Sequence, residues 1–408
     1  MGIFSSSDQS GFDVAIGPCR AVLNFLGAWV DPVEPQTTFA LFRFFLSTST
    51  MIIFSCLVQT IEVFRGWGDL NYVIEILIID DIPICVAVMK FIVSFYNKDI
   101  LKRLVVLMAK DWQSKYADED WKIMWETAQF SRKLSLVCIL LAEGTITAQC
   151  MVVLMFDLYS KDKKERPLYM HSYFPFNTQT SPNYEFTWFG QFMCTVYAAS
   201  AFSSVDAFFG VLVLHLCGQL SVLKRNLKVL THNDKENLDS DEFTRRIAAL
   251  VDRHDHLNMF AKTLEDSFNL MFLPQMIGTS LAMCLQGYQL VVISTGSEEG
   301  LPLLQIFHMV YFTTCFSFSL FVYCFVAERL QFESTEIDYA AYQSEWYNWA
   351  PRDTRLLLLL MGRARKPLEI TAGKFCVFSL GLYCSILKTC GGYVSMLLAV
   401  RRRLVQNQ

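Results

Sequence analysis

The fold is decided by the last apolar stretch of the chain, Thr371-Ala-Gly-Lys-Phe-Cys-Val-Phe-Ser-Leu-Gly-Leu-Tyr-Cys-Ser-Ile-Leu-Lys-Thr-Cys-Gly-Gly-Tyr-Val-Ser-Met-Leu-Leu-Ala-Val400. It exceeds the roughly 20 residues that a helix needs to cross a bilayer. It is also patterned, with small and hydroxyl side chains, Lys388 near its middle and three arginines directly after it. A simple lipid anchor needs no such pattern, so this span is expected to line a passage or to pack against other helices.

The composition extends this expectation to the whole chain. Of 408 residues, 53% are hydrophobic and only 18% are charged, and the mean hydropathy is +0.32. Soluble domains carry about 25% charged residues. The sequence therefore predicts an all-α polytopic membrane protein with seven transmembrane helices, at about 38–61, 70–96, 133–157, 189–217, 267–294, 302–327 and 373–400.

Lysine and arginine are distributed unevenly between the connections of these spans. The segments before the first span and at 97–133, 218–266 and 328–374 hold 24 of them, and the alternate connections hold eight. Basic residues collect on the cytoplasmic side of a membrane. The N-terminus is therefore expected in the cytoplasm and the C-terminus outside the cell, which is opposite to the orientation of G-protein-coupled receptors.

The cytoplasmic connections are expected to form a helical layer. Residues 1–37 predict an interfacial helix rather than a signal peptide, and residues 218–266 predict helical extensions of the spans in the region 38–327. A cytoplasmic anchor helix is expected in 328–370, followed by the last helix and an extracellular tail in 371–408. Aromatic side chains in the anchor, Tyr342, Trp346 and Tyr347, suggest subunit assembly, although a compact monomeric cap would bury them as well.

The chemistry-bearing residues do not form a recognisable active site. Nearly all of the 13 cysteines fall inside predicted spans, and no CxxC pair or Cys/His spacing indicates a metal. We expect no metal, no cofactor, no nucleic-acid partner and no enzymatic activity. Asp80 and Asp81 are unusual inside a span. They indicate a water-filled vestibule or a salt bridge, or else they lie near the outer interface.

Three motifs together resemble the insect odorant receptor family. They are the last span with Ser385-Ile-Leu-Lys-Thr389 and Tyr393, the segment Ala340-Ala-Tyr-Gln-Ser-Glu-Trp-Tyr347 with Arg363-Ala-Arg-Lys-Pro-Leu368, and His254-Asp-His-Leu-Asn-Met-Phe-Ala261. The resemblance covers the C-terminal 160 residues. It implies an odorant-tuned subunit of a non-selective cation channel, a heterotetramer with co-receptor subunits in the plasma membrane of sensory neurons. Gustatory-receptor-type channels share that fold, and a small-molecule transporter remains a further alternative.

The resemblance also implies roles for residues of the last span. Met396 and Val400 lie four apart on one helix face, where the family alignment places a hydrophobic constriction, and Tyr393 lies one turn below Met396. Lys388 is expected off this face, paired with Glu143, Asp80 or Asp81. Arg401 to Arg403 would surround a cation path with positive charge in a homotetramer, which favours a heteromer in which this chain is the minority.

A small volatile ligand requires an apolar, aromatic-lined cavity, which we expect in the outer half of the bundle. Stripes at helical spacing can equally be ordinary core. The long outer connection 158–188 is expected to act as a lid over an opening or to be a solvated connector. The candidate ligand residues are Ile74, Ile78, Gly144, Thr147, Met151, Phe189, Phe192, Met193, Tyr197, Phe307, His308 and Tyr311.

Overall fold

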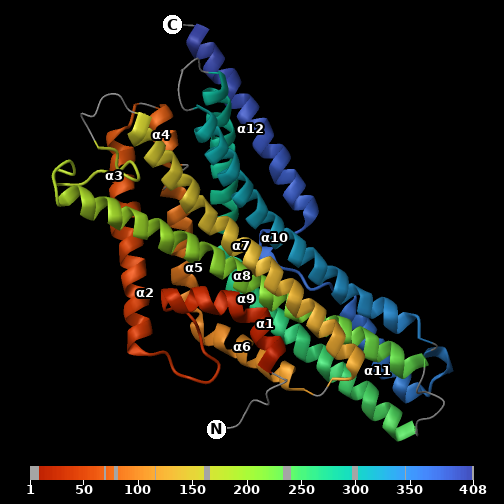
Figure 1. Ribbon diagram of the computed structural model, residues 1–408. Helices are drawn as coiled ribbons and strands as arrows, with labels where there is room; N and C mark the ends of the chain where they lie inside the picture. The colour runs from red at the N-terminus through yellow and green to blue at the C-terminus, as the bar shows by residue number, and fades with distance from the viewer. Residues whose placement is uncertain are drawn as a thin grey trace.

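The computed structural model describes residues 9–68, 70–77, 81–114, 116–159, 166–232, 240–295, 302–344 and 346–406. Nearly all of them lie in helices, which confirms the all-α prediction. Figure 1 shows the two termini at opposite ends of an elongated bundle. Termini at opposite ends are consistent with an odd number of membrane crossings.

Four long helices form the body of the molecule. They are α7 (Asp118–Tyr159), α8 (Asn183–His232), α9 (Ser240–Thr295) and α10 (Pro302–Tyr342), with 42, 50, 56 and 41 residues. At roughly 1.5 Å per residue, each is about twice as long as a bilayer core is thick or more. Each span therefore continues without a break into a region beyond the membrane.

The N-terminal part of the chain supplies the shorter helices. α1 (Gln9–Leu26) packs across α7 and α8, and it ends where Gly27 adopts a φ of 76°. The first span consists of α2 (Thr38–Met51), a π-helical turn (Ile52–Cys56) and α3 (Leu57–Arg65). The Thr37 side chain caps α2 by accepting a hydrogen bond of 3.2 Å from the Ala40 N–H.

The second predicted span, 70–96, contains the helices α4 (Leu70–Ile76) and α5 (Ile82–Tyr96), with Pro83 in the first turn of α5. Residues 78–80, between them, lie outside the described residues. A proline there lacks only an N–H that the helix would not use. Among the described residues, six helices are long and apolar enough to cross a membrane, and α5, with 15 residues, is a shorter apolar helix. The six long helices, together with α5 in the second predicted span, correspond to the seven predicted crossings.

The last span begins later than its sequence predicts. Residues 371–377 form a small hairpin of two strands, β1 (Thr371–Ala372) and β2 (Cys376–Val377), in which Thr371 pairs with Val377 and Ala372 with Cys376. Gly373 and Lys374 turn the hairpin with φ values of 58° and 63°, a left-handed conformation that ends regular structure. The predicted start at residue 373 is corrected to Leu380, where α12 (Leu380–Gln406) begins.

Two further elements follow α10. They are a 3₁₀ turn (Trp346–Asn348) and α11 (Pro351–Ala364), which lies beside α10 and α9. Earlier in the chain, α6 (Lys98–Gln113) follows α5 and also contacts α9.

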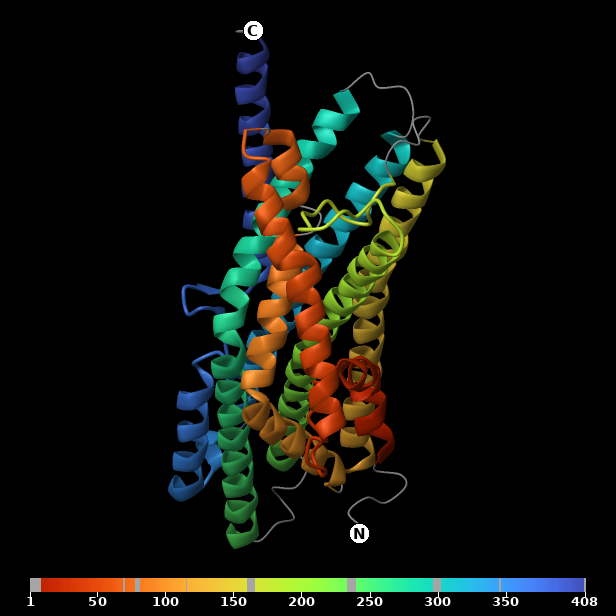
Figure 2. The same ribbon diagram turned by 90° about the vertical axis from the view of Figure 1, so that its left-hand side faces the viewer.

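Helix α8 lies at the centre of the bundle, and α12 lies at its margin (Figures 1 and 2). The most apolar window of α8 is 94% buried within the chain, whereas that of α12 is 6% buried. The main core cluster is accordingly built around α8 residues such as Leu212, Leu216 and Leu220. Most of the surface of α12 is thus left uncovered by its own chain.

Candidate functional site

A cavity lies inside the bundle between α5, α7, α8 and α10. Its enclosed volume is about 100 Å³. Small-molecule sites typically have mainly apolar walls with a few polar groups. The lining of this cavity therefore suits a small, mainly apolar ligand.

Three of the long helices, α7, α8 and α10, each contribute one face to the cavity. The lining positions of α7, α8 and α10 recur at intervals of three and four residues, which is the spacing of one helix face. They are Cys138, Leu141, Ala142, Thr145, Ile146 and Gln149 on α7, Thr195, Ala198, Ala199, Phe202, Ser203 and Asp206 on α8, and His308, Phe312, Cys315, Phe316, Phe318 and Ser319 on or beside the corresponding face of α10. Alanines on α8 leave the space, and phenylalanines on α10 make the wall apolar.

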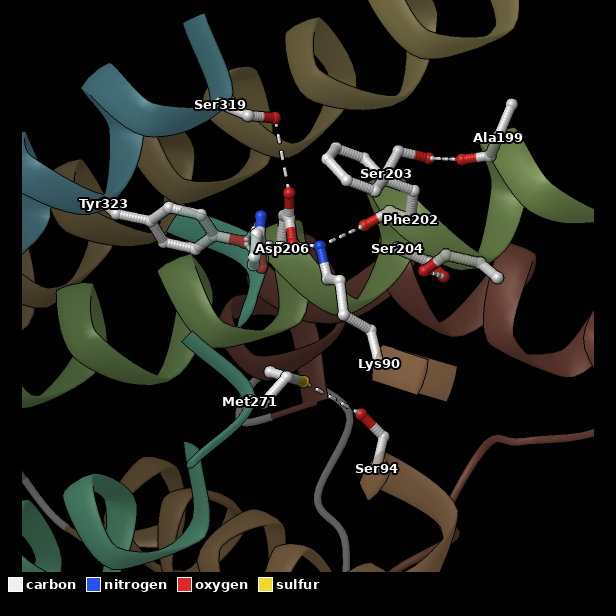
Figure 3. Close-up of polar contacts among 12 residues, drawn as sticks. Lys90, Ser94, Ala199, Phe202, Ser203, Ser204, Asp206, Met271, Ser319 and Tyr323 are labelled. Carbon is white, nitrogen blue, oxygen red and sulfur yellow. Dashed lines mark hydrogen bonds and ion pairs between the residues drawn. The ribbon is translucent and has the colours of Figure 1, made fainter. Parts of the chain in front are cut away.

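An ion pair lies at one end of the cavity (Figure 3). Lys90 of α5 donates a hydrogen bond to Asp206 of α8, and their side chains are 0% and 3% exposed. Lys90 Nζ also donates to the Phe202 carbonyl at 3.2 Å and lies 3.8 Å from the centre of the Phe202 ring. A buried charge is costly unless it is paired and hydrogen-bonded, and this arrangement supplies both.

Asp206 is held from further directions as well. Ser319 Oγ donates to its Oδ2 at 3.3 Å, the Tyr323 hydroxyl donates to its Oδ1, and Gln275 Nε2 donates to the Tyr323 oxygen at 2.7 Å. One network therefore joins α5, α8, α9 and α10. Because Asp206 and Ser319 also line the cavity, the network connects the cavity wall with the helices around it.

The same network extends toward α12. The Tyr323 ring lies 5.8 Å, centre to centre, from Phe378, and Phe272 lies 5.4 Å from Phe378. Phe378 is 1% exposed and precedes α12 by two residues. A rigid aromatic contact thus links the end of the cavity to the start of the last helix.

The described part of the outer connection closes against the bundle. Tyr169 is 1% exposed and lines the cavity, with its ring edge-on to Trp188 and Phe192. Gln191 binds the connection by accepting from Met170 N–H at 3.3 Å and donating to Met170 O at 3.0 Å. The sequence left two interpretations open, a lid over an opening or a solvated connector. The geometry of residues 166–182 favours the lid.

The structure brings one of the twelve predicted ligand residues to the cavity, namely His308. Tyr311 instead donates its hydroxyl to Leu141 O at 3.0 Å, and a Cβ added to Gly144 would lie 2.1 Å from that hydroxyl. Ile74 packs against Tyr288 in another cluster. Phe192 and Tyr197 pack in the core near α2 and α5, Met193 is half-buried, and Met151, Phe189, Phe307 and Thr147 are exposed. Ile78 lies outside the described residues.

The difference arises from rotation about the helix axis. One residue corresponds to about 100° around a helix, so Phe307 and Tyr311 point away from the face that carries His308 and Phe312. On α8, the cavity face also begins deeper in the bundle than the predicted stripe, at Thr195 rather than Phe189.

The residues predicted for the last span and the anchor lie on the surface of the chain. Tyr393 and Met396 are 55% and 59% exposed, and Tyr342 and Tyr347 are exposed as well, while Trp346 is half-buried. The side chain of Val400 lies outside the described residues, as do those of the three arginines after it. Apart from Trp346, which packs against the core, the described side chains of this set are therefore left exposed by their own chain.

Among the described residues, Lys388 forms no ion pair with Glu143 or Asp81. It is exposed on α12, while Glu143 accepts a hydrogen bond of 2.7 Å from Ser200. Asp81 accepts one of 3.4 Å from Thr60, and Asp80 lies outside the described residues. The buried lysine that does form an ion pair is Lys90, which was not among the predicted site residues. A lysine and an aspartate inside two apolar spans are themselves a signal for such a pair.

The fold and the cavity together define a seven-crossing helical membrane protein with an internal apolar site. A sequence model of the family described as 7tm Odorant receptor matches residues 77–391. The chain therefore belongs to the insect odorant receptor family, as its motifs predict.

Relatives in Drosophila melanogaster support this assignment. Odorant receptor 22c is 26% identical over 211 residues, which are 50% of each chain, and odorant receptor 13a is 25% identical over 251 residues, which are 59% of each chain. The match thus spans about half the length of these relatives. The odorant receptor coreceptor of Aedes aegypti is 24% identical over 151 residues, 37% of this chain and 30% of its own. The chain therefore belongs with odorant receptors such as 22c and 13a and is not the coreceptor.

Solved structures agree in fold. The olfactory receptor OR5 of Machilis hrabei superposes with a TM-score of 0.80 at 16% identity, over 94% of this chain and 97% of that one. Its complex with eugenol gives 0.79 at 15% identity, over 96% and 98%. Similarity at this level of identity establishes the architecture alone.

Proposed function

We propose that this chain is the odorant-tuned subunit of a ligand-gated, non-selective cation channel, assembled with co-receptor subunits as a heterotetramer in the plasma membrane of sensory neurons. The observation that carries the proposal is the contrast between α8 and α12. One span is almost fully enclosed and borders the cavity, and another, rich in small and hydroxyl residues, is almost uncovered by its own chain. Because little of α12 is buried by its own chain, α12 is suited to an assembly in which it faces other subunits, lipid and a passage.

The ligand of this subunit is a small volatile molecule that binds in the cavity. Most of the free energy of binding comes from burial of apolar surface, at roughly 25 cal/mol per Å², against Phe202, Phe312 and Phe316. That the Machilis hrabei receptor of the same fold was solved with eugenol supports a ligand of this size.

The passage is lined by α12, with Tyr393, Met396 and Val400 on the side that faces it. Met396 and Val400 lie four residues apart, so four subunits would bring apolar rings together at two levels, a constriction that closes a pore by excluding water. The exposed anchor residues Tyr342 and Tyr347, with Trp346, contact neighbouring subunits in the cytoplasmic layer.

The effect of ligand binding is transmitted to α12 through the hydrogen-bond network at the end of the cavity. A ligand that displaces Phe202 or Ser319 shifts Asp206 and Tyr323, and Tyr323 contacts Phe378 before α12. A ligand that binds better when α12 is in its open position then favours the open state.

Electrophysiology tests this proposal. The chain is expressed in cells with and without an odorant receptor coreceptor, and currents are recorded while a panel of volatiles is applied. We expect volatile-evoked cation currents that reverse near 0 mV in symmetric cation solutions and that require both chains. A response that depends on G-protein signalling, or a small flux coupled to an ion gradient, would refute the channel proposal.

A further inference from the structure

His308 places an unpaired polar atom on the cavity wall. The residue lies on the cavity-facing side of α10, is 4% exposed, and packs its ring 5.7 Å from that of Phe312. Its Nε2 has no hydrogen-bond partner within the described ranges. A buried polar atom without a partner is unfavourable, and such atoms in native proteins usually have a role.

The other polar groups of the wall are engaged by the protein. Thr145, Thr195 and Ser203 donate to carbonyl oxygens of their own helices at 2.6, 2.7 and 2.8 Å. Gln149 Nε2 donates to Tyr169 O at 3.5 Å, and Ser319 donates to Asp206. Asp206 is itself neutralised by Lys90. A ligand therefore meets apolar surface, hydroxyls whose protons are used, the Gln149 amide, and the buried imidazole nitrogen of His308, which has no partner among the described residues.

We propose that His308 is a specificity-determining residue that selects ligands bearing a hydroxyl group, namely alcohols or phenols with an otherwise apolar body. The inference rests on the proposed function, since it assigns the ligand class of the same cavity. The hydroxyl binds Nε2, and the apolar body lies against Phe312 and the alanines of α8.

A hydroxyl fits this position better than other oxygen groups. A neutral imidazole carries its proton on one ring nitrogen, so Nε2 is either a donor or an acceptor. A hydroxyl both donates and accepts and can pair with Nε2 in either tautomer, whereas a carbonyl or ether pairs only when Nε2 carries the proton. A hydrocarbon leaves Nε2 unpaired in both cases.

The experiment compares matched ligands on matched variants. Medium-chain primary alcohols and alkanes of equal length are the probes, applied to the channel formed with the coreceptor. The variants are His308→Leu, which removes the hydrogen bond, and His308→Gln, which keeps a polar group at similar reach. Val310→Ala is the control, because Val310 lies two residues further on the same helix and is exposed.

The expected result is selective for the hydroxyl. For alcohols, the half-maximal concentration rises about tenfold in His308→Leu, as the loss of one hydrogen bond predicts, and His308→Gln restores most of the sensitivity. The alkanes, weaker on the native receptor, change little, and Val310→Ala leaves both probes unchanged. Equal potency of alkanes and alcohols on the native receptor, or equal losses for both in His308→Leu, overturns the inference.

Binding of radiolabelled octanol to the purified protein separates this inference from the proposed function. Binding that is weakened by His308→Leu, without any current in cells, supports the assignment of His308 while the channel proposal fails. Currents evoked by volatiles without a hydroxyl, and no His308-dependent octanol binding, leave the channel proposal intact and refute the assignment.

Discussion

Lys90 and Asp206 form an ion pair in the middle of the helical bundle, although 116 residues separate them in the sequence. The pair closes one end of the cavity and ties α5 to α8. The resemblance to known receptors did not predict this ion pair. The pair therefore supplies the first testable prediction.

Removal of one partner should destabilise the protein more than removal of both. Lys90→Met or Asp206→Leu alone leaves an unpaired buried charge, at a cost of about 3–5 kcal/mol, whereas the double variant leaves none. Thermal unfolding of the purified protein in detergent measures this, with surface expression as a second readout. Additive losses in the double variant would show that the two side chains do not interact.

The hydroxyl of Tyr323 should matter for gating more than for ligand binding. Tyr323→Phe removes its hydrogen bonds to Asp206 and Gln275 but keeps the ring contact with Phe378. We expect a lower maximal current, with octanol affinity changed less than about fivefold, because Tyr323 does not line the cavity and a net hydrogen bond is worth about 1 kcal/mol. Tyr339→Phe is a matched control, since Tyr339 is 56% exposed on the same helix. Equal effects of both variants would contradict the role of Tyr323.

The cover over the cavity should control how quickly a ligand leaves. Gln191→Leu removes both hydrogen bonds to the backbone of Met170, while its volume stays similar. We expect currents to decay several-fold faster after ligand washout, because about 1–3 kcal/mol of cover stability is lost. Gln179→Leu removes contacts of Gln179 with Arg166 that lie farther out in the same connection, and it should leave the decay nearly unchanged. An unchanged decay in Gln191→Leu would show that residues 166–182 do not close the site.

An ion cluster that joins α6, α8 and α9 should make stability depend on pH in the acid range. Burial alone would raise the pKa of Asp111, but the hydrogen bond from His215 at 3.1 Å and the charge of Arg253 at 2.8 Å outweigh it and hold this pKa below the usual 3.8. A depressed carboxylate pKa contributes stability that is complete above the ordinary value and is lost as pH falls through the folded-state value. The unfolding temperature should therefore fall below about pH 4, and Asp111→Asn should flatten that part of the profile. An identical acid profile in the variant would contradict the assignment.

The sequence was most informative where a pattern repeats along the chain. Long apolar segments and the uneven distribution of lysine and arginine predict the helical class, and the motif around Tyr393 predicts the family. These signals depend on composition and periodicity, which the bilayer imposes directly. The turn at Gly373 is a local exception that shortens the last predicted span.

The cavity was harder to predict because it depends on the rotation of several helices at once. His308 was found because it is a polar residue on an apolar helix, but Phe307 and Tyr311 satisfy the same spacing and point elsewhere. Ala198 and Ala199 create space only because the neighbouring helices bring no large side chain opposite them. Lys90 and Asp206 were visible as charges inside spans, and only the packing of α5 against α8 identifies them as partners.

The central claim is that a ligand in the cavity opens an ion path lined by α12. The most direct measurement is the rate at which a charged, membrane-impermeant thiol reagent modifies Met396→Cys in the channel formed with the coreceptor, with and without octanol, and with the unsubstituted chain as control. The account predicts that modification reduces the current and is at least several-fold faster when the ligand is present. A current that the reagent does not alter, or a modification rate that the ligand does not change, would contradict it.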